Sequence, residues 1–196
     1  TRLENNKLEY IAELSSIIRN NASIENDIII TVENNAVARR IFKLIKSIYD
    51  VTPNITVRKR YNFNNNLSYI LKIKNKKDII LKDLSIVVDG VYQNVPKNYI
   101  INDEECLRAY LRGLFIGAGS VNDPKTSRYH LEFIVDNHEY AEYISTLLNR
   151  FHLNSKIIKR EKNYMVYVKE AEKISDFLRI INSYNGVMYF EDIRIY

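Results

Sequence analysis

Residues 107–120 read LRAYLRGLFIGAGS, and this stretch decides the fold predicted for the rest of the chain. Its apolar residues recur at steps of three and four, as along one face of an α-helix: Leu107, Tyr110, Leu111, Leu114 and Phe115. Gly113 and Gly117 lie on the same surface, although a glycine costs about 1 kcal/mol in a helix interior. Because missing side chains let a second backbone approach, we expect this helix to pack closely against another helix. Gly119 is expected to end it in the left-handed conformation typical of helix C-termini.

The composition is that of an ordinary globular protein. Of its 196 residues, 46% are hydrophobic and 27% are charged, which suits one large domain or two small, similar ones. No apolar run approaches the ~20 residues that cross a bilayer, so no membrane partner is expected. The chain starts at Thr1 without a signal peptide, which predicts a trimmed N-terminus, and the single Cys106 excludes an internal disulfide and fits a reducing cytoplasm. The net charge of +5 and the pI near 9.1 favour an anionic partner, with nucleic acid as the first candidate.

The first half of the chain predicts alternating helices and strands. Amphipathic patterns indicate helices over residues 8–21, 34–49 and 79–86. Runs rich in β-branched residues indicate strands over residues 27–32, 55–61 and 67–73, the last two joined by an Asn-rich hairpin turn. Residues 89–102, which include Gly90 and Pro96, are predicted to form a linker.

After the linker the pattern starts again. Helices are expected over residues 107–118, 139–151 and 171–181, and strands over 129–135, 156–160 and 164–168. Glu33-Asn34-Asn35 corresponds to Asp136-Asn137-His138, and Val57-Arg58-Lys59 corresponds to Ile158-Lys159-Arg160. If a short strand follows the first helix of each half, at residues 23–24 and 120–121, each half runs αββαββα. This duplication predicts an α+β fold in which the two first helices pair along a pseudo-twofold axis under two antiparallel sheets.

The stretch from Leu111 to Gly119, LRGLFIGAG, resembles the nine-residue LAGLIDADG motif of homing endonucleases. The first half has LSSIIRNNA, residues 14–22, in the equivalent place, with Ser16 opposite Gly113. The resemblance implies tandem LAGLIDADG-like repeats over residues 1–88 and 103–185. It also implies a close helix interface, for which we predict these residues: Leu14, Ser16, Ile17, Leu111, Gly113, Leu114 and Gly117.

Over nearly its whole length the chain resembles the WhiA family of bacterial regulators. Three segments resemble that family's sequences and occur in the same order: ENNAVARRIFKLIKSIYDV, AYLRGLFIGAGSVNDP and VKEAEKISDFLRIINSYNGVMYFEDIRI. The resemblance implies a degenerate homing-endonuclease domain, with residues 186–196 starting the connection to a C-terminal helix-turn-helix domain outside this chain. It further implies a cytoplasmic, nucleoid-associated transcription regulator linked to sporulation or cell division.

The residues that the resemblance assigns to catalysis have been replaced. The enzymes need a carboxylate at the eighth position of each motif, where it holds a divalent metal that activates water. In this chain the eighth positions are Asn21 and Ala118, and the sixth positions are Arg19 and Ile116. We therefore predict no catalytic residue, no metal site and no cofactor. An active metal-dependent endonuclease stays open as an alternative, since Asp27 and Asp123 follow the helix ends, although Asp123-Pro124 is typical of a turn.

Other chemistry is not indicated. His130, His138 and His152 lack metal-ligand spacing, and Cys106 has no evident histidine partner for nucleophilic catalysis. Gly117-Ala118-Gly119 is followed by no Lys-Ser or Lys-Thr pair and is therefore no phosphate loop.

The predicted strands carry basic residues suited to contacts with DNA phosphates. The candidate DNA-binding residues are Arg58, Arg60, Lys72, Lys74, Lys159, Arg160 and Lys162. The alternative is an ordinary solvated sheet face, and Glu161 and Glu170 interrupt the second group. Two interpretations stay open: a module that associates with double-stranded DNA, and a protein-interaction scaffold derived from a nuclease fold. In the resembled family, a helix-turn-helix domain is the main reader of DNA.

Overall fold

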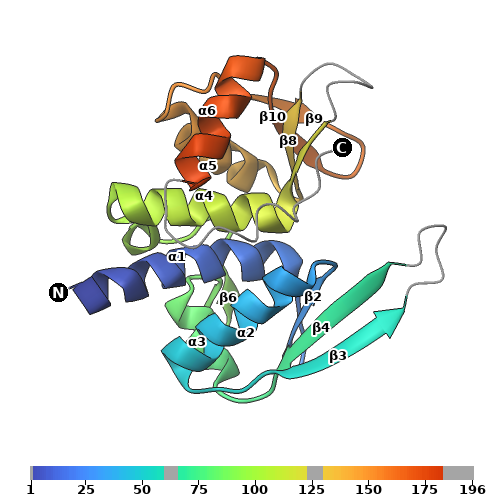
Figure 1. Cartoon of the computed structure of the whole chain (residues 1–196). Helices are drawn as coiled ribbons and strands as arrows, with labels where there is room; N and C mark the ends of the chain where they lie inside the picture. The colour runs from blue at the N-terminus through green and yellow to red at the C-terminus, as the bar shows by residue number, and fades with distance from the viewer. Residues whose placement is uncertain (1, 60–65, 123–129, 183–196) are drawn as a thin grey trace.

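A computed structural model describes residues 2–59, 66–122 and 130–182, which form two similar halves (Figure 1). The elements of the first half are α1 (Arg2–Asn21), β1 (Ala22–Ile24), β2 (Ile28–Val32), α2 (Asn35–Tyr49), β3 (Asn54–Lys59), β4 (Leu67–Ile73) and α3 (Lys77–Asp83). Those of the second half are α4 (Glu104–Ala118), β7 (Gly119–Val121), β8 (Leu131–Val135), α5 (His138–Asn149), β9 (Lys156–Lys159), β10 (Tyr164–Val168) and α6 (Ala171–Asn182). The repeated order confirms the predicted α+β fold.

Each half has an antiparallel sheet with the same strand order. The orders are β1-β2-β4-β3 and β7-β8-β10-β9. Val32 pairs with Tyr69 in the first sheet as Val135 pairs with Tyr164 in the second. The helices after the second strand also start alike, because Asn34 and Asn137 accept hydrogen bonds from the backbone N–H three residues later. The duplication therefore extends to strand register and helix capping.

Helices α1 and α4 lie side by side between the two sheets (Figure 1). Ser16 Oγ on α1 donates a hydrogen bond to Tyr110 O on α4 over 2.7 Å. A Cβ atom built on Gly113 would lie 2.2 Å from Ser16 Oγ and 2.3 Å from the backbone oxygen of Glu13. Glycine at this position allows the two backbones to come this close.

Gly119 differs from the prediction made for it. Its φ of −95° and ψ of 154° are extended rather than left-handed, and it is the first residue of β7. A Cβ at this position would lie 2.6 Å from Phe115 Cδ2 and 2.9 Å from Phe115 Cα. The glycine therefore makes room for the preceding helical turn, and the expectation of a left-handed cap was wrong.

The segment predicted to be a linker has structure of its own. It includes β6 (Val91–Tyr92), which pairs with β5 (Val87–Val88), and a 3₁₀ helix (Asn98–Ile101). Ile100 and Ile101 of the 3₁₀ helix are buried in the core. Apolar residues between the repeats thus anchor the connection instead of leaving it in solvent.

Most predicted element bounds agree with the structure within a few residues, with two larger differences. Helix α1 begins at Arg2 rather than at residue 8. Helix α3 ends at Asp83 rather than at residue 86, because the chain turns at Ser85, whose φ is 56°, and the Ile86 N–H donates to Leu81 O. The predicted connection at residues 186–196 lies outside the described residues.

Candidate nucleic-acid interface

The two motif helices end at equivalent residues. Asn21 is the last residue of α1 and Ala22 the first of β1, just as Ala118 is the last residue of α4 and Gly119 the first of β7. The eighth position of each motif is thus the last helical residue, and the ninth begins the strand. The structure therefore agrees with the alignment of LSSIIRNNA with LRGLFIGAG.

These helix ends do not fit a divalent metal ion. Mg²⁺ prefers charged oxygen ligands, whereas the Ala118 side chain offers no ligand atom and Asn21 has an uncharged amide, whose nitrogen donates to Ile17 O over 2.8 Å. Within residues 2–59, 66–122 and 130–182, no three His, Cys, Asp or Glu side chains lie close enough to hold a metal ion. Asp27 is partly exposed in the turn before β2, and Asp123 lies outside the described residues.

Arg19, at the sixth motif position, makes contacts within the molecule. Its guanidinium donates to Ser85 O over 2.6 Å and to Gln93 O. The same group lies 5.4 Å from the centre of the Tyr92 ring and 5.3 Å from that of Tyr140. Arg19 thus joins α1 to the β5–β6 hairpin and to α5 of the second half. Sequence reasoning missed these contacts because residues 89–102 were predicted to form a linker.

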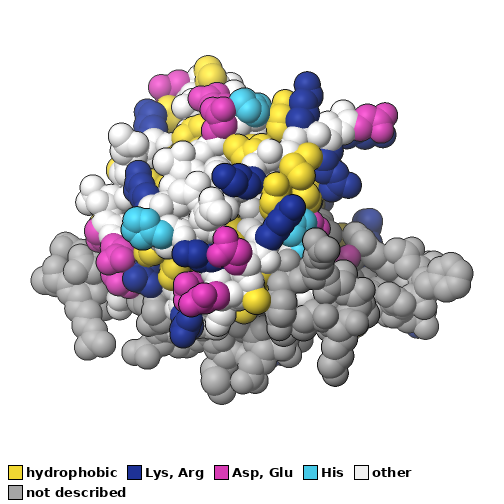
Figure 2. Space-filling view, turned by 90° about the horizontal axis from the view of Figure 1, so that it is seen from above, with side chains coloured by type: hydrophobic (Ala, Val, Ile, Leu, Met, Phe, Trp, Pro, Cys, Tyr) yellow, Lys and Arg dark blue, Asp and Glu magenta, His cyan; other side chains and the backbone are white. Residues whose placement is uncertain are grey.

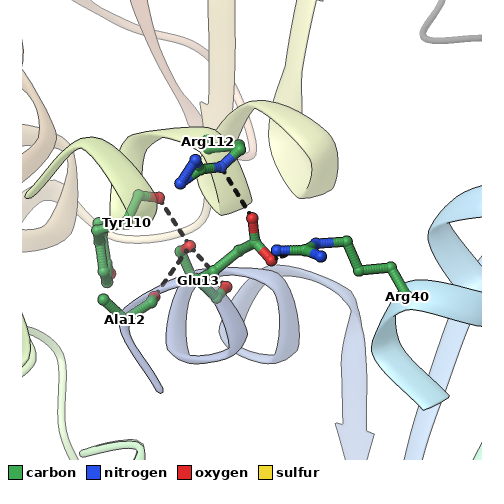
Figure 3. A network of polar contacts seen from close by, with 6 residues as sticks. Ala12, Glu13, Arg40, Tyr110 and Arg112 are labelled. Carbon is green, nitrogen blue, oxygen red and sulfur yellow. Dashed lines mark hydrogen bonds and ion pairs between the residues drawn. The ribbon is translucent and has the colours of Figure 1, made fainter. Parts of the chain in front are cut away.

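A buried ion-pair network crosses the helix interface (Figure 3). The Arg112 Nε donates to Glu13 Oε1 over 2.9 Å, and the Arg40 Nε donates to Glu13 Oε2 over 2.7 Å. The side chains of Glu13 and Arg112 are only 1% and 2% exposed. Sequence reasoning missed this network too, since its members become neighbours only when α1, α2 and α4 are placed together.

Buried tyrosines lie next to the network. The hydroxyls of Tyr110 and Tyr140 are 2.6 Å apart, and Asn20 Nδ2 donates to the Tyr140 hydroxyl over 3.3 Å. Burial raises the pKa of both tyrosines above the ordinary value, so both stay neutral at physiological pH. This end of the interface holds neutral hydroxyls and amides beside the Arg19 guanidinium.

The cysteine and histidines have ordinary structural contacts. Burial, with a smaller effect of the neighbouring Asp103, raises the pKa of the Cys106 thiol to about 12, so the thiolate needed of a nucleophile is disfavoured at neutral pH. His130 Nδ1 lies 3.3 Å from Glu132 Oε2, and His138 Nε2 lies 3.3 Å from Glu142 Oε1.

Strand register assigns the basic residues of the first sheet to its two faces. We call the face turned away from the buried core the outer face, and Leu71 and Ile73 of β4 define the opposite, core side. Because side chains alternate along a strand, Ser68 and Lys72 of β4 both lie on the outer face. Arg58 lies on that face too, since it pairs with Ser68. Lys74 is exposed just after β4, and Arg60 lies outside the described residues.

The second sheet presents its basic residues differently. Lys159 pairs with Tyr164, on the side of the buried Val166, so it does not share the outer face. Lys156, which pairs with Tyr167, does share it. Arg160 and Lys162 are exposed at the turn between β9 and β10.

Comparison with known proteins gives the family of the chain. Residues 8–87 match the family model of the WhiA N-terminal LAGLIDADG-like domain, and residues 107–196 match that of the WhiA LAGLIDADG-like domain. The chain belongs to the WhiA family. Proteins named probable cell division protein WhiA, from Staphylococcus aureus strains JH9 and Newman, are each 42% identical to it over its full length. The chain spans 64% of the length of these WhiA relatives.

Solved structures confirm the LAGLIDADG fold. The crystal structure of the N-terminal LAGLIDADG domain of DUF199/WhiA has a TM-score of 0.66 and 22% identity, covering 92% of this chain and 86% of that one. Full-length DUF199/WhiA from Thermatoga maritima has a TM-score of 0.67 and 21% identity, covering 95% of this chain and 59% of that one. I-DmoI, solved in complex with DNA and Mn, has a TM-score of 0.63 and 15% identity, covering 91% of this chain and 99% of that one.

On the face of this WhiA-family chain that Figure 2 shows, charges of both signs are mixed. Figure 2 shows Lys and Arg side chains on the side of the molecule where β9 and β10 lie in Figure 1, with Asp and Glu side chains among them. Glu132 lies on the outer face of the second sheet, between Ser120 of β7 and Tyr167 of β10. Among the described helices, none combines the length and apolar character that crossing a membrane requires.

Proposed function

We propose that this chain is a non-cleaving, DNA-associating module of a WhiA-family transcription regulator. The observation that carries the proposal is the pair of helix ends, where Asn21 and Ala118 replace the two carboxylates that the resembled endonucleases use. A catalytic metal placed there would lack charged oxygen ligands, and Arg19 would add a positive charge nearby. The fold is thus retained without the chemistry of hydrolysis.

DNA association through the first sheet is supported by the charges on its outer face. Arg58 is exposed, Lys72 is partly exposed on the same face, and Lys74 follows directly after β4. Contacts of this kind neutralise phosphates and release counterions, so they add salt-dependent affinity without reading sequence. In the full-length regulator we assign the main double-stranded DNA contact to a C-terminal helix-turn-helix domain outside this chain. The proposed setting is the nucleoid in the bacterial cytoplasm, in control linked to sporulation and cell division.

An electrophoretic shift assay with duplex DNA over a salt series tests the proposal. At about 50 mM salt and micromolar protein, we expect a shift that weakens steeply as salt rises. The double substitution Arg58→Glu and Lys72→Glu should remove it. Lys59→Glu is the matched control, because Lys59 carries the same charge but pairs with Leu67 on the other face of β3. Absence of any shift would refute DNA association by this chain.

The absence of cleavage needs its own assay. Supercoiled plasmid incubated with the chain and Mg²⁺ or Mn²⁺ should stay intact, because neither helix end supplies a carboxylate. Metal-dependent nicking that Asp123→Asn abolishes would establish the endonuclease alternative instead.

A protein-interaction scaffold is the second candidate. It is favoured by the outer face of the second sheet, where Glu132 places a carboxylate that would repel phosphate.

A further inference from the structure

The outer face of the second sheet carries a row of three apolar side chains. Met165 of β10 pairs with Ile134 of β8 on one side and with Ile158 of β9 on the other. All three therefore point to the same face, away from the buried Phe133 and Val166. Ile158 is 43% exposed, and the other two are partly exposed.

The first sheet has a different row at the equivalent register. There Ile70 of β4 pairs with Thr31 of β2 and with Thr56 of β3. Two hydroxyl side chains in the first half thus correspond to two isoleucines in the second. The apolar row is therefore a property of one half and does not follow from the repeated fold.

Charged groups around the row favour an acidic partner other than DNA. Lys156 is exposed beside the row, and Lys169 Nζ lies 5.2 Å from the centre of the Tyr167 ring on the same face. Arg160 and Lys162 add positive charge at the nearby turn, where Glu161 offsets one of the two. Apolar side chains give nothing to phosphates, whereas a protein surface with apolar and acidic side chains complements both the row and the neighbouring lysines.

The spacing of the row fits a helix. Neighbouring strands lie about 4.8 Å apart, so the three side chains span roughly 10 Å. Helix positions i, i+3 or i+4, and i+7 rise by about 5 Å per step and about 10.5 Å in total. Same-face residues of an extended peptide are about 6.8 Å apart and would match the row less well.

We propose that the outer face of the second sheet docks an amphipathic helix of a partner protein, whose apolar side chains contact Ile134, Met165 and Ile158 and whose acidic side chains face Lys156 and Lys169. This inference does not rest on DNA association by the first sheet. The two sheets then have different partners, and the asymmetry of their faces is the reason.

Fluorescence anisotropy with a labelled synthetic amphipathic helix of Leu and Glu tests the proposal. We expect saturable binding to the 196-residue chain, and little binding of the same peptide with Lys in place of Glu. Ile158→Asp should weaken binding by about tenfold or more, as loss of a central anchor does. Thr56→Asp, at the equivalent register of the first sheet, is the matched control and should leave binding unchanged.

Three outcomes would overturn the proposal. One is failure of the Leu-Glu peptide to bind, and another is binding that Ile158→Asp leaves unchanged. The third is self-association in sedimentation velocity that Ile158→Asp abolishes, which would assign the face to a second copy of the chain. Lys156→Glu, at an exposed position, should also weaken binding and keeps the test decisive if Ile158→Asp does not fold. The gel shift with duplex DNA separates this surface from the one proposed for DNA. It should be lost in the double variant Arg58→Glu with Lys72→Glu and kept in Ile158→Asp.

Discussion

Gly113 and Gly117 are four residues apart on the same helix, yet their surroundings differ. At Gly113 the obstacles to a Cβ include the backbone oxygen of Glu13 at 2.3 Å, which cannot move without shifting α1. At Gly117 the nearest obstacle is the Asn21 amide nitrogen, also at 2.3 Å, but it ends a flexible side chain. The two glycines look alike in the sequence, but a side chain at Gly113 would meet backbone, whereas one at Gly117 would meet a side chain that can move.

We predict that Gly113→Ala destabilises the chain much more than Gly117→Ala. The first change forces two backbones apart and should lower the free energy of unfolding by about 1–3 kcal/mol, as overpacking does. The second gains about 1 kcal/mol of helix propensity, which offsets the displacement of Asn21. Urea denaturation of both variants measures the difference, and Gly113→Leu should cost more than either. Equal midpoints for Gly113→Ala and the unchanged chain would contradict the close approach of the helices.

At the scale of the elements, the amphipathic periods and the internal repeat were enough to predict the helices and strands that the two halves share, and their arrangement in two antiparallel sheets. The face of a single side chain was harder to predict. Lys159 was grouped with the DNA-binding candidates, whereas the pairing of β9 with β10 puts Lys156 on the outer face. A change of register by one residue exchanges the two faces of a strand, and the sequence contains no direct record of register.

The β5–β6 hairpin shows a second limit of reasoning from sequence. Its strands have two residues each, too short for any periodicity. Arg19 of α1 connects the hairpin to the helix through backbone carbonyl groups, which every residue possesses. A contact between a side chain and distant backbone atoms leaves no pattern of residue types, so only the structure reveals it.

We predict that Arg19→Leu loosens the hairpin while the helix persists. The substitution keeps an apolar stem but removes the donors to Ser85 O and Gln93 O, and charged hydrogen bonds contribute about 1.5–3 kcal/mol each. Amide hydrogen exchange should accelerate in residues 86–93 relative to the unchanged chain. Arg39→Leu, at an exposed position of α2, is the control and should leave that exchange as it was. Unchanged exchange in the Arg19 variant would show that other contacts hold the hairpin.

At the scale of the whole molecule, Glu13 joins three helices from both halves. Its two carboxylate oxygens accept from Arg112 on α4 and Arg40 on α2, so one buried anion ties the first half to the second (Figure 3). The non-cleaving module proposed above has no need of a metal ion at its helix ends, but binding through both sheets needs them in a fixed relation. The network supplies that relation at the centre of the interface, close to Ser16 and Gly113.

We predict that Glu13→Ala lowers the free energy of unfolding by about 3–5 kcal/mol, because it leaves the positive charge of Arg112 buried without its anion. Arg40→Ala should cost less, since the Arg40 side chain is 24% exposed and water replaces part of its contact. The double variant Glu13→Leu with Arg112→Leu should recover part of the loss, as it removes both charges. Urea denaturation followed by both circular dichroism and tyrosine fluorescence measures these differences.

The same titrations show whether the halves unfold together. With the network intact, one transition should describe both probes, because the halves share one core and one helix interface. Glu13→Ala should shift that transition to lower urea, and Glu105→Ala, at an exposed position of α4, should leave it in place. If Glu13→Ala had no more effect than Glu105→Ala, the ion pairs would contribute nothing net, and the coupling of the halves would rest on the apolar contacts of α1 with α4 alone.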